Sequence, residues 1–353
     1  MQYLQYNVCA NTELIIEFLE EEPAFQEFIG RKMLEAKGGI GVWFSTGGYI
    51  PDRYELNIPV QPLTACELRD AISNGEYSKV MVYTSEAGAP ILGQTDAFDQ
   101  TVLHWAVLKN AVPLFEPLIK YMREADILKQ SKGMQTALHY AIYGSLETSA
   151  FIDAMIKLRP DVLRQLANTG DESGILPLYY AAASRGCTIT EILYHYTDPA
   201  RLTDFDSNGL SLLHLAITNS HEGLTRLLMS DSDLAKKLVA IRDPRDDSTI
   251  LHLAASIGTV TDIELLTSDA ELIGLVDAKG LTPLHIAVQR DNIDICRALC
   301  ERMSSKQFCV QTVDDGHTVL HAAVQAGNIE IVRVISDAYT NKVRLEQLVD
   351  TTA

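Results

Sequence analysis

The sequence predicts an all-α fold in which short helix–turn–helix units follow one another along most of the 353 residues. Three observations indicate this fold. One six-residue phrase recurs through the chain, apolar residues after each phrase keep helical spacing, and Asp, Asn and Gly gather between the units. A repeat array also removes the usual expectation that a chain of this length forms two or three globular domains.

The recurring phrase begins with Thr or Ser and continues with Leu, His and Ala at fixed positions. Its copies are TVLHWA at Thr101, TALHYA at Thr136, SLLHLA at Ser211, TILHLA at Thr249, TPLHIA at Thr282 and TVLHAA at Thr318, with a degraded copy, LPLYYA, at Leu176. Consecutive copies are 35, 40, 35, 38, 33 and 36 residues apart. Chance does not produce so specific a phrase at such even intervals, so the chain contains an internal repeat.

Each copy of the phrase predicts the start of a helix. The Thr or Ser can accept a hydrogen bond from the free amides of the first turn, and Pro283 suits the first helical position, where no donor is needed. Leu284 and Ala287 share one face, and the small Ala lets a neighbouring helix approach closely. A second helix should follow after a short turn, as in residues 291–303 and 327–339.

Turn-forming residues separate the units. The segments are DESG at 171–174, DSNG at 206–209, DAKG at 277–280 and DDG at 314–316. Asp and Asn favour turn conformations and Gly supplies a positive φ, so each segment predicts a short hairpin, here called a finger.

The phrase resembles the signature of the ankyrin-repeat family, TPLHxA in units of about 33 residues, over about residues 64–350. The resemblance implies a solenoid of about eight helix–turn–helix units with short hairpin fingers, forming a domain of residues 63–353. The units are expected to start near residues 64, 96, 131, 171, 206, 244, 277 and 313. The first unit keeps Ala71 and Gly75 but has lost the Thr and His of the phrase, as an end cap can.

The two ends depart from the repeat. Residues 1–62 predict two short helices broken at Pro23, with Asn11 as a cap, and form either a small N-terminal helical cap or a docking segment. At the other end, LEQLVDTTA matches ELIGLVDAKG and places Asp350 where Asp277 begins a finger. We therefore expect the natural array to be truncated here, the alternative being that the polar last helix caps it.

The composition narrows the class of partner. Forty-seven acidic against 29 basic residues give a formal charge of −18, which repels nucleic acid and anionic lipid. No basic-then-apolar leader and no apolar run long enough for membrane insertion is present in the sequence, so we expect a cytoplasmic protein. The scattered cysteines fit reduced thiols, and Cys296 and Cys300, four apart, are interpreted as core residues because no second ligand pair accompanies them.

The histidines of the phrase recur at the same position of each full copy and could be mistaken for a row of metal ligands. They are His104, His139, His214, His252, His285 and His321. The family resemblance implies a structural role instead, with hydrogen bonds to the hairpin backbone of a neighbouring unit. No metal and no cofactor is expected. The glycine-rich GGIGVWFSTGG at residues 38–48 lacks the ending of a phosphate loop, and no nucleophile or metalloprotease motif occurs, so no enzymatic activity is predicted.

The resemblance implies a partner-binding surface made from finger tips and the exposed edge of the inner helices. The candidate residues are Phe98, Leu108, Lys109, Tyr143, Ile175, Leu210, Asn219, Arg245, Ile257, Lys279, Leu281, Arg290, Asp314 and His317. The alternative is that the apolar residues at position five of the fingers pack against the next finger, which leaves only Phe98, Tyr143, Arg245 and Arg290 free.

The function expected from the sequence is that of a monomeric scaffold that binds a partner protein of unknown identity. One alternative is a substrate-targeting arm of a larger enzyme whose catalytic domain lies outside this chain. Another is suggested by the uneven unit lengths, which resemble those of ankyrin effectors that intracellular bacteria inject into host cells; such a protein would act in the host cytosol.

Overall fold

The computed structural model describes residues 63–85, 88–144, 148–184, 189–267 and 272–350. Within these ranges the chain is helical, and extended pairing is limited to isolated bridges such as Thr95 with Thr101. The predicted all-α repeat fold is therefore confirmed. The helices expected in residues 1–62 lie outside the described residues. The described residues fall into two compact units, one within residues 63–132 and 144–162 (unit 1) and one within residues 133–143 and 163–350 (unit 2).

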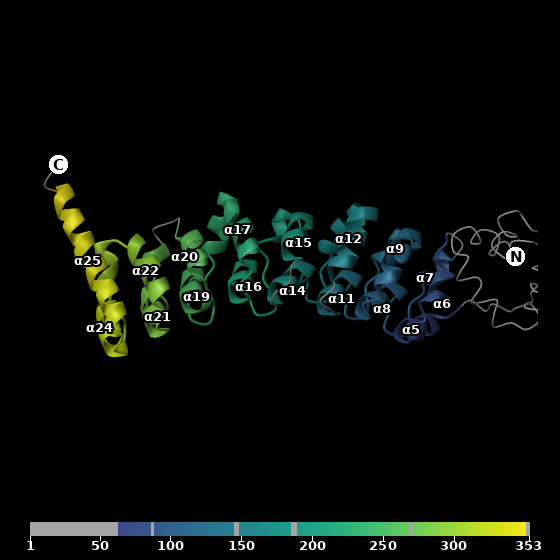
Figure 1. Cartoon of the computed structure of the whole chain (residues 1–353), viewed down its shortest axis with the longest axis horizontal. Coiled ribbons are helices and arrows are strands. Elements are labelled where there is room, and N and C mark those ends of the chain that lie inside the picture. The colour runs from purple at the N-terminus through teal and green to yellow at the C-terminus, as the bar shows by residue number, and fades with distance from the viewer. Residues whose placement is uncertain (1–62, 86–87, 145–147, 185–188, 268–271, 351–353) are drawn as a thin grey trace, which may run out of the picture. The chain divides into compact units, whose positions relative to one another are not determined.

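The described part of unit 1 contains two inner helices, three outer helices and two short connecting helices. In chain order they are α5 (Ala65–Ser73), α6 (Tyr77–Met81), α7 (Ala89–Leu92), α8 (Val102–Leu108), α9 (Val112–Tyr121), α10 (Glu124–Ile127) and α12 (Thr148–Leu158). Inner helix α5 packs on α8, while outer helix α6 packs on α9 and α9 packs on α12 (Figure 1). Phe115 and Phe151 meet edge to face at 5.7 Å between the two outer helices.

Unit 2 continues the pattern with further helix pairs. Its elements are α11 (Ala137–Gly144), α13 (Pro160–Ala167, whose first residues fall in unit 1), α14 (Pro177–Ala183), α15 (Thr190–Tyr196), η2 (Pro199–Arg201), α16 (Leu212–Thr218), α17 (Glu222–Ser230), α18 (Ser232–Val239), α19 (Ile250–Ile257), α20 (Val260–Leu266), η3 (Leu272–Gly274), α21 (Pro283–Gln289), α22 (Ile293–Arg302), α23 (Ser305–Phe308), α24 (Val319–Ala326) and α25 (Ile329–Asp350).

The helices of unit 2 form two rows. Each of the inner helices α14, α16, α19, α21 and α24 packs on the next, and so does each of the outer helices α15, α17, α20, α22 and α25 (Figure 1). The alanine of the phrase lies at these contacts, and Ala181, Ala216, Ala254 and Ala287 are fully buried. The small side chain therefore has the role that the sequence predicted, which is to let neighbouring helices approach.

The phrase caps its own helix through the Thr–His pair. Thr282 Oγ1 accepts a hydrogen bond from the His285 amide, and His285 Nδ1 accepts one from the Thr282 amide at 3.2 Å. The imidazole thus takes the place of the Glu in the usual capping box. Helix α5 keeps the Glu version, because Thr64 caps it and the Thr64 amide donates to the Glu67 carboxylate at 2.7 Å. This first copy had lost the Thr and His of the phrase. Its capping Thr lies two residues further from Ala71 than the Thr of the other copies lies from their alanine.

Two features differ from the sequence prediction. A short third helix or 3-10 turn follows most outer helices, as α13 and α18 do, and these insertions account for spacings as long as 40 and 38 residues. The last outer helix, α25, runs for 22 residues to Asp350. Asp350 therefore does not begin a finger, and that match was wrong. No Gly or Pro interrupts Ile329–Asp350, so nothing in the sequence stops the helix.

Candidate partner-binding surface

The fingers that begin with Asp are folded by that carboxylate. Asp277 Oδ1 accepts hydrogen bonds from the amides of Lys279 at 2.9 Å and Leu281 at 2.8 Å. Asp96, Asp171 and Asp206 bind their own fingers in the same way. Gly280, with φ of 74°, supplies the left-handed residue that the turn needs. The finger is therefore shaped locally, before any partner arrives.

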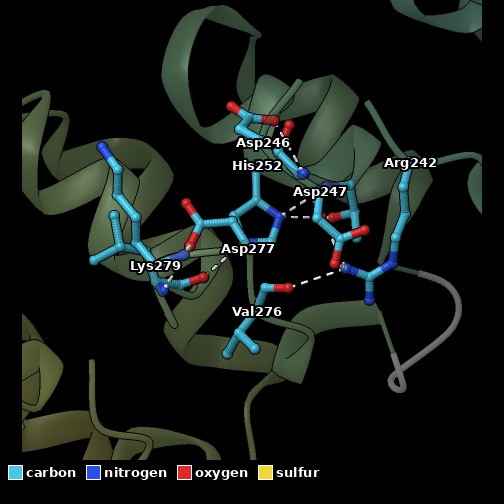
Figure 2. Close-up of polar contacts among 10 residues, drawn as sticks. Arg242, Asp246, Asp247, His252, Val276, Asp277 and Lys279 are labelled. Atoms are coloured by element: carbon cyan, nitrogen blue, oxygen red, sulfur yellow. Dashed lines mark hydrogen bonds and ion pairs between the residues drawn. The ribbon is translucent and has the colours of Figure 1, made fainter. Parts of the chain in front are cut away.

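Neighbouring fingers are joined by backbone hydrogen bonds. In unit 2 the Ala278 amide donates to the Asp246 carbonyl at 2.9 Å, and the Val313 amide donates to the Lys279 carbonyl at 3.0 Å. Arg242 Nη1 adds a bridge between the Asp247 carboxylate, at 2.9 Å, and the Val276 carbonyl, at 3.0 Å (Figure 2). The tips within this unit consequently hold fixed positions relative to one another.

The histidine of the phrase connects one repeat to the next finger. His252 Nδ1 accepts from the Thr249 amide at 3.2 Å, which leaves the proton on Nε2, and Nε2 lies 2.8 Å from the Leu281 carbonyl (Figure 2). His139 Nε2 reaches the Ile175 carbonyl in the same way at 3.2 Å. The structural role implied by the family resemblance is confirmed for these two histidines. Burial lowers the pKa of both imidazoles.

A groove of about 440 Å³ lies in unit 2 between the fingers and inner helices α16, α19 and α21. It brings together three of the predicted residues, Leu210, Arg245 and Arg290. Gln289, on the inner-helix edge beside Arg290, lines it too. The groove also adds residues that the sequence analysis did not select, namely His214, Thr218, Asp243, Asp246, Ser248, His252, Leu253, Ser256, Asp277 and Ile286. The groove is therefore more polar than the predicted set, which was rich in apolar residues.

Two guanidinium groups are held in place at this groove. Arg245 Nε donates to both carboxylate oxygens of Asp243, at 2.9 and 3.2 Å, and this hydrogen bonding lowers the pKa of Asp243. Arg290 Nε donates to Ser256 Oγ at 3.0 Å. Both arginines remain exposed. Because their orientation is set in advance, little side-chain freedom would be lost when they contact a partner.

The other predicted residues of unit 2 fall into three groups by exposure. Tyr143, Ile257, Lys279 and Asp314 are exposed, Leu210, Leu281, Asn219 and His317 are half-buried, and Ile175 is buried at 7%. Ile175 is thus unavailable to a partner, and the packing alternative holds for it. Asn219 Nδ2 donates to the carbonyls of Ala182 and Leu215, both at 3.0 Å, so its amide links α14 to α16.

In unit 1 the predicted residues lie on one finger and on the end of α8. Phe98 is 58% exposed at the finger tip, Lys109 is exposed and Leu108 is half-buried. The Asp96 carboxylate orders this finger and also accepts from Trp105 Nε1 of α8 at 2.9 Å. Phe98 is therefore presented to solvent by a finger that is fixed to its own inner helix.

Tyr180 is a candidate residue that the sequence analysis missed. Its ring lies 5.1 Å from that of Tyr143, between centroids, and its hydroxyl donates to Asp171 at the base of a finger. It occupies the position just before the alanine of the degraded phrase, where other copies place Trp105 and Tyr140. That position could have indicated it, because Trp105 at the same position also donates to the Asp at the start of a finger.

No other site chemistry is evident in the ranges that the structure describes. There, no three His, Cys, Asp or Glu side chains are grouped to hold a metal ion. No described helix is long and apolar enough to span a bilayer. Cys296 and Cys300 are buried, and burial raises the pKa of each thiol to about 12, so both are protonated at neutral pH.

Comparison with known proteins identifies the repeat. The family model for ankyrin repeats in three copies matches residues 229–308 and 251–345. This part of the chain is therefore built of ankyrin repeats, and its helix pairs, fingers and capping histidines are those of ankyrin units. The ankyrin repeat is a general protein–protein interaction fold and is generally a non-catalytic binding module.

Curated relatives share the repeats at low identity. Human inversin is 26% identical over 211 residues, covering 58% of this chain and 18% of inversin, so the chain spans about a fifth of that relative. A Saccharomyces cerevisiae protein named as the probable 26S proteasome regulatory subunit p28 is 23% identical over 205 residues, covering 58% of this chain and 86% of p28. Among solved structures, the ankyrin repeat domain of Bcl-3 matches with a TM-score of 0.48 and 20% identity, covering 67% of this chain and 98% of that chain.

Proposed function

We propose that this chain is a non-catalytic binding protein that holds a partner protein on its finger tips and inner-helix edges. The proposal rests on the observation that these residues already hold fixed positions in the unbound chain. Asp carboxylates fold the fingers that begin with Asp, backbone bonds join neighbouring fingers, and Arg245 and Arg290 are held at the groove of unit 2. Such a surface loses little conformational freedom on binding.

Aromatic residues and arginines make up the proposed contact. Phe98 in unit 1 and Tyr143 in unit 2 are more than half exposed, although apolar rings of this size usually lie in a core. Trp, Tyr and Arg dominate the energetics of protein interfaces. We infer that Phe98, Tyr143, Arg245 and Arg290 are the principal contacts, with Tyr180 supporting Tyr143, and that Ile175 and Asn219 serve the fold instead.

The class of partner is a protein. The net charge of −18 disfavours nucleic acid and anionic membranes, and an ankyrin relative, p28, is by its name a probable subunit of a larger protein assembly. The remaining hypotheses, a targeting arm of an enzyme and an effector in a host cytosol, stay predictions.

The test is affinity purification from a lysate of the source cells, with the wild-type chain and the double variant Phe98→Ala/Tyr143→Ala compared side by side. Loss of two aromatic contacts should weaken binding of the captured partner at least about tenfold, with far-UV circular dichroism unchanged. Val260→Ala is the matched control, because Val260 is also exposed, at 37%, but lies at the start of outer helix α20. Equal capture by wild type and double variant would reject this surface.

A further inference from the structure

Two tyrosine rings, here called the tyrosine pair, lie against each other beside an acidic finger of unit 2. Tyr143 of α11 is 57% exposed, and its ring centre is 5.1 Å from that of Tyr180 of α14. The Tyr180 hydroxyl donates to Asp171, which begins the finger that continues with the exposed Glu172. A phenol that donates to a carboxylate has a more electron-rich ring, and the face of such a ring attracts positive charge. Aromatic faces and carboxylates thus lie together at this place.

Unit 1 contains a similar arrangement that holds an arginine. Trp105 occupies the position in its phrase that Tyr180 occupies in the degraded copy, and Trp105 Nε1 donates to Asp96 at 2.9 Å. The guanidinium of Arg69, from inner helix α5, lies over the Trp105 ring at 5.7 Å from the ring centre. An aromatic ring that donates to the first carboxylate of a finger therefore has a guanidinium as its neighbour in this protein.

Among the residues that the structure describes, no cation lies over the tyrosine pair. No described Lys or Arg is stacked on either ring, and neither Asp171 nor Glu172 forms an ion pair with a described residue. His139 meets the Tyr180 ring edge to face at 5.7 Å, but burial lowers the pKa of His139, so its imidazole is neutral at pH 7. The described chain therefore leaves the negative charge beside these rings without a positive partner.

We propose that the tyrosine pair and its finger receive an arginine side chain of the partner protein. The inference rests on the proposed function, in which Tyr143 is a principal contact, and it adds the chemistry of the group that Tyr143 contacts. A guanidinium has a planar face that stacks on an aromatic ring and donors that suit carboxylates. The fingers extend this complementarity, because Asp246 and Asp314 are also exposed and form no ion pair within the described ranges. The partner is therefore basic where it meets this face.

NMR spectroscopy of the whole chain with isotopically labelled tyrosine rings tests the proposal with two short peptides. One peptide is N-acetyl-Gly-Ser-Arg-Ser-Gly amide, and the other has citrulline, the neutral isostere of arginine, in place of Arg. The arginine peptide should shift the Tyr143 and Tyr180 ring signals until the site is saturated. The citrulline peptide should bind at least about fivefold more weakly, because it has the shape of arginine without the charge.

Two variants at position 143 separate the aromatic face from apolar bulk, with binding followed on the Tyr180 signal. Tyr143→Leu stays apolar but has no ring, so the arginine peptide should bind it at least about fivefold more weakly. Tyr143→Phe is the matched control, which keeps the ring and should bind the peptide like the wild type. The side chain is 57% exposed, so both substitutions leave the fold intact.

Three results would overturn the arginine site: no saturable shift with the arginine peptide, equal affinities for the two peptides, or an unchanged affinity in Tyr143→Leu. These results are distinct from failure of the proposed function. If the Phe98→Ala/Tyr143→Ala variant loses the partner but the arginine peptide does not bind, the surface stands and only the arginine site is rejected. If that double variant captures the partner as the wild type does, the proposed function is rejected whatever the peptides show.

Discussion

Protonation of His285 should destabilise the fold in a defined pH window. The imidazole is 1% exposed, and burial lowers its pKa to about 4 from the ordinary value of 6.5. The Nδ1 atom of His285 accepts a hydrogen bond from the Thr282 amide at 3.2 Å, and it lies 2.8 Å from the Thr282 hydroxyl oxygen. A proton on Nδ1 would abolish the bond from the amide and place an unpaired charge in the core. The neutral form is therefore the one that the folded chain requires.

The sign and size of the effect follow from the two pKa values. Since the folded pKa is lower than the unfolded one, the stabilisation is present above pH 6.5 and is lost as the pH falls towards 4. Between pH 7 and pH 5 the loss attributable to His285 amounts to about 2 kcal/mol. His285→Gln removes this titration, and Gln can still complete the capping box with Thr282.

Urea unfolding followed by far-UV circular dichroism, at pH 7 and at pH 5, measures the difference in unfolding free energy between wild type and His285→Gln. That difference should shrink by about 2 kcal/mol at the lower pH. A His285→Gln difference that does not change with pH would refute the reasoning.

Two further predictions concern the fingers and the core thiols. Gly280→Ala should lower the unfolding free energy by about 2 to 3 kcal/mol, because φ is 74° and the added Cβ would lie 2.9 Å from atoms of the next finger. Gly316→Ala is the control: its φ is also positive, but no atom lies within 4 Å of the added Cβ, so the loss should be only about 1 kcal/mol. Equal losses of the two variants in urea unfolding would contradict the clash. Burial raises the thiol pKa of Cys296 and Cys300 to about 12, so both should resist alkylation by iodoacetamide in the folded chain and react after denaturation. Peptide mass spectrometry measures this labelling. Rapid labelling of the native protein would contradict the burial of the two thiols.

The repeat itself could be predicted because the residues that start each inner helix lie close together in the sequence. Thr282, Pro283 and Ala287 specify a cap, a first turn and a close helix contact within six residues. The family resemblance added the contact from the histidine to the next finger. These features depend on residues near one another in sequence, and the structure reproduces them.

What could not be predicted depends on contacts between distant residues. Ile175 and Leu281 hold the same place in their fingers, yet one is buried and the other half-buried, since exposure is set by the neighbouring repeat. The residues around Asp350 match those that begin a finger at Asp277, but Asp350 lies in the uninterrupted helix α25. The exposure of Leu320 and Val324 could not be predicted either, because they are the same residue types as their buried counterparts Leu284 and Val288.

The hydrogen bond from His252 to the Leu281 carbonyl has a consequence for how the array comes apart. Because the imidazole of one module completes its bonding only when the following finger is folded, melting of that finger would leave the preceding module with a donor stranded in its interior. Such nearest-neighbour coupling makes adjacent modules of unit 2 lose their structure together, so thermal unfolding should spread in blocks instead of one repeat at a time.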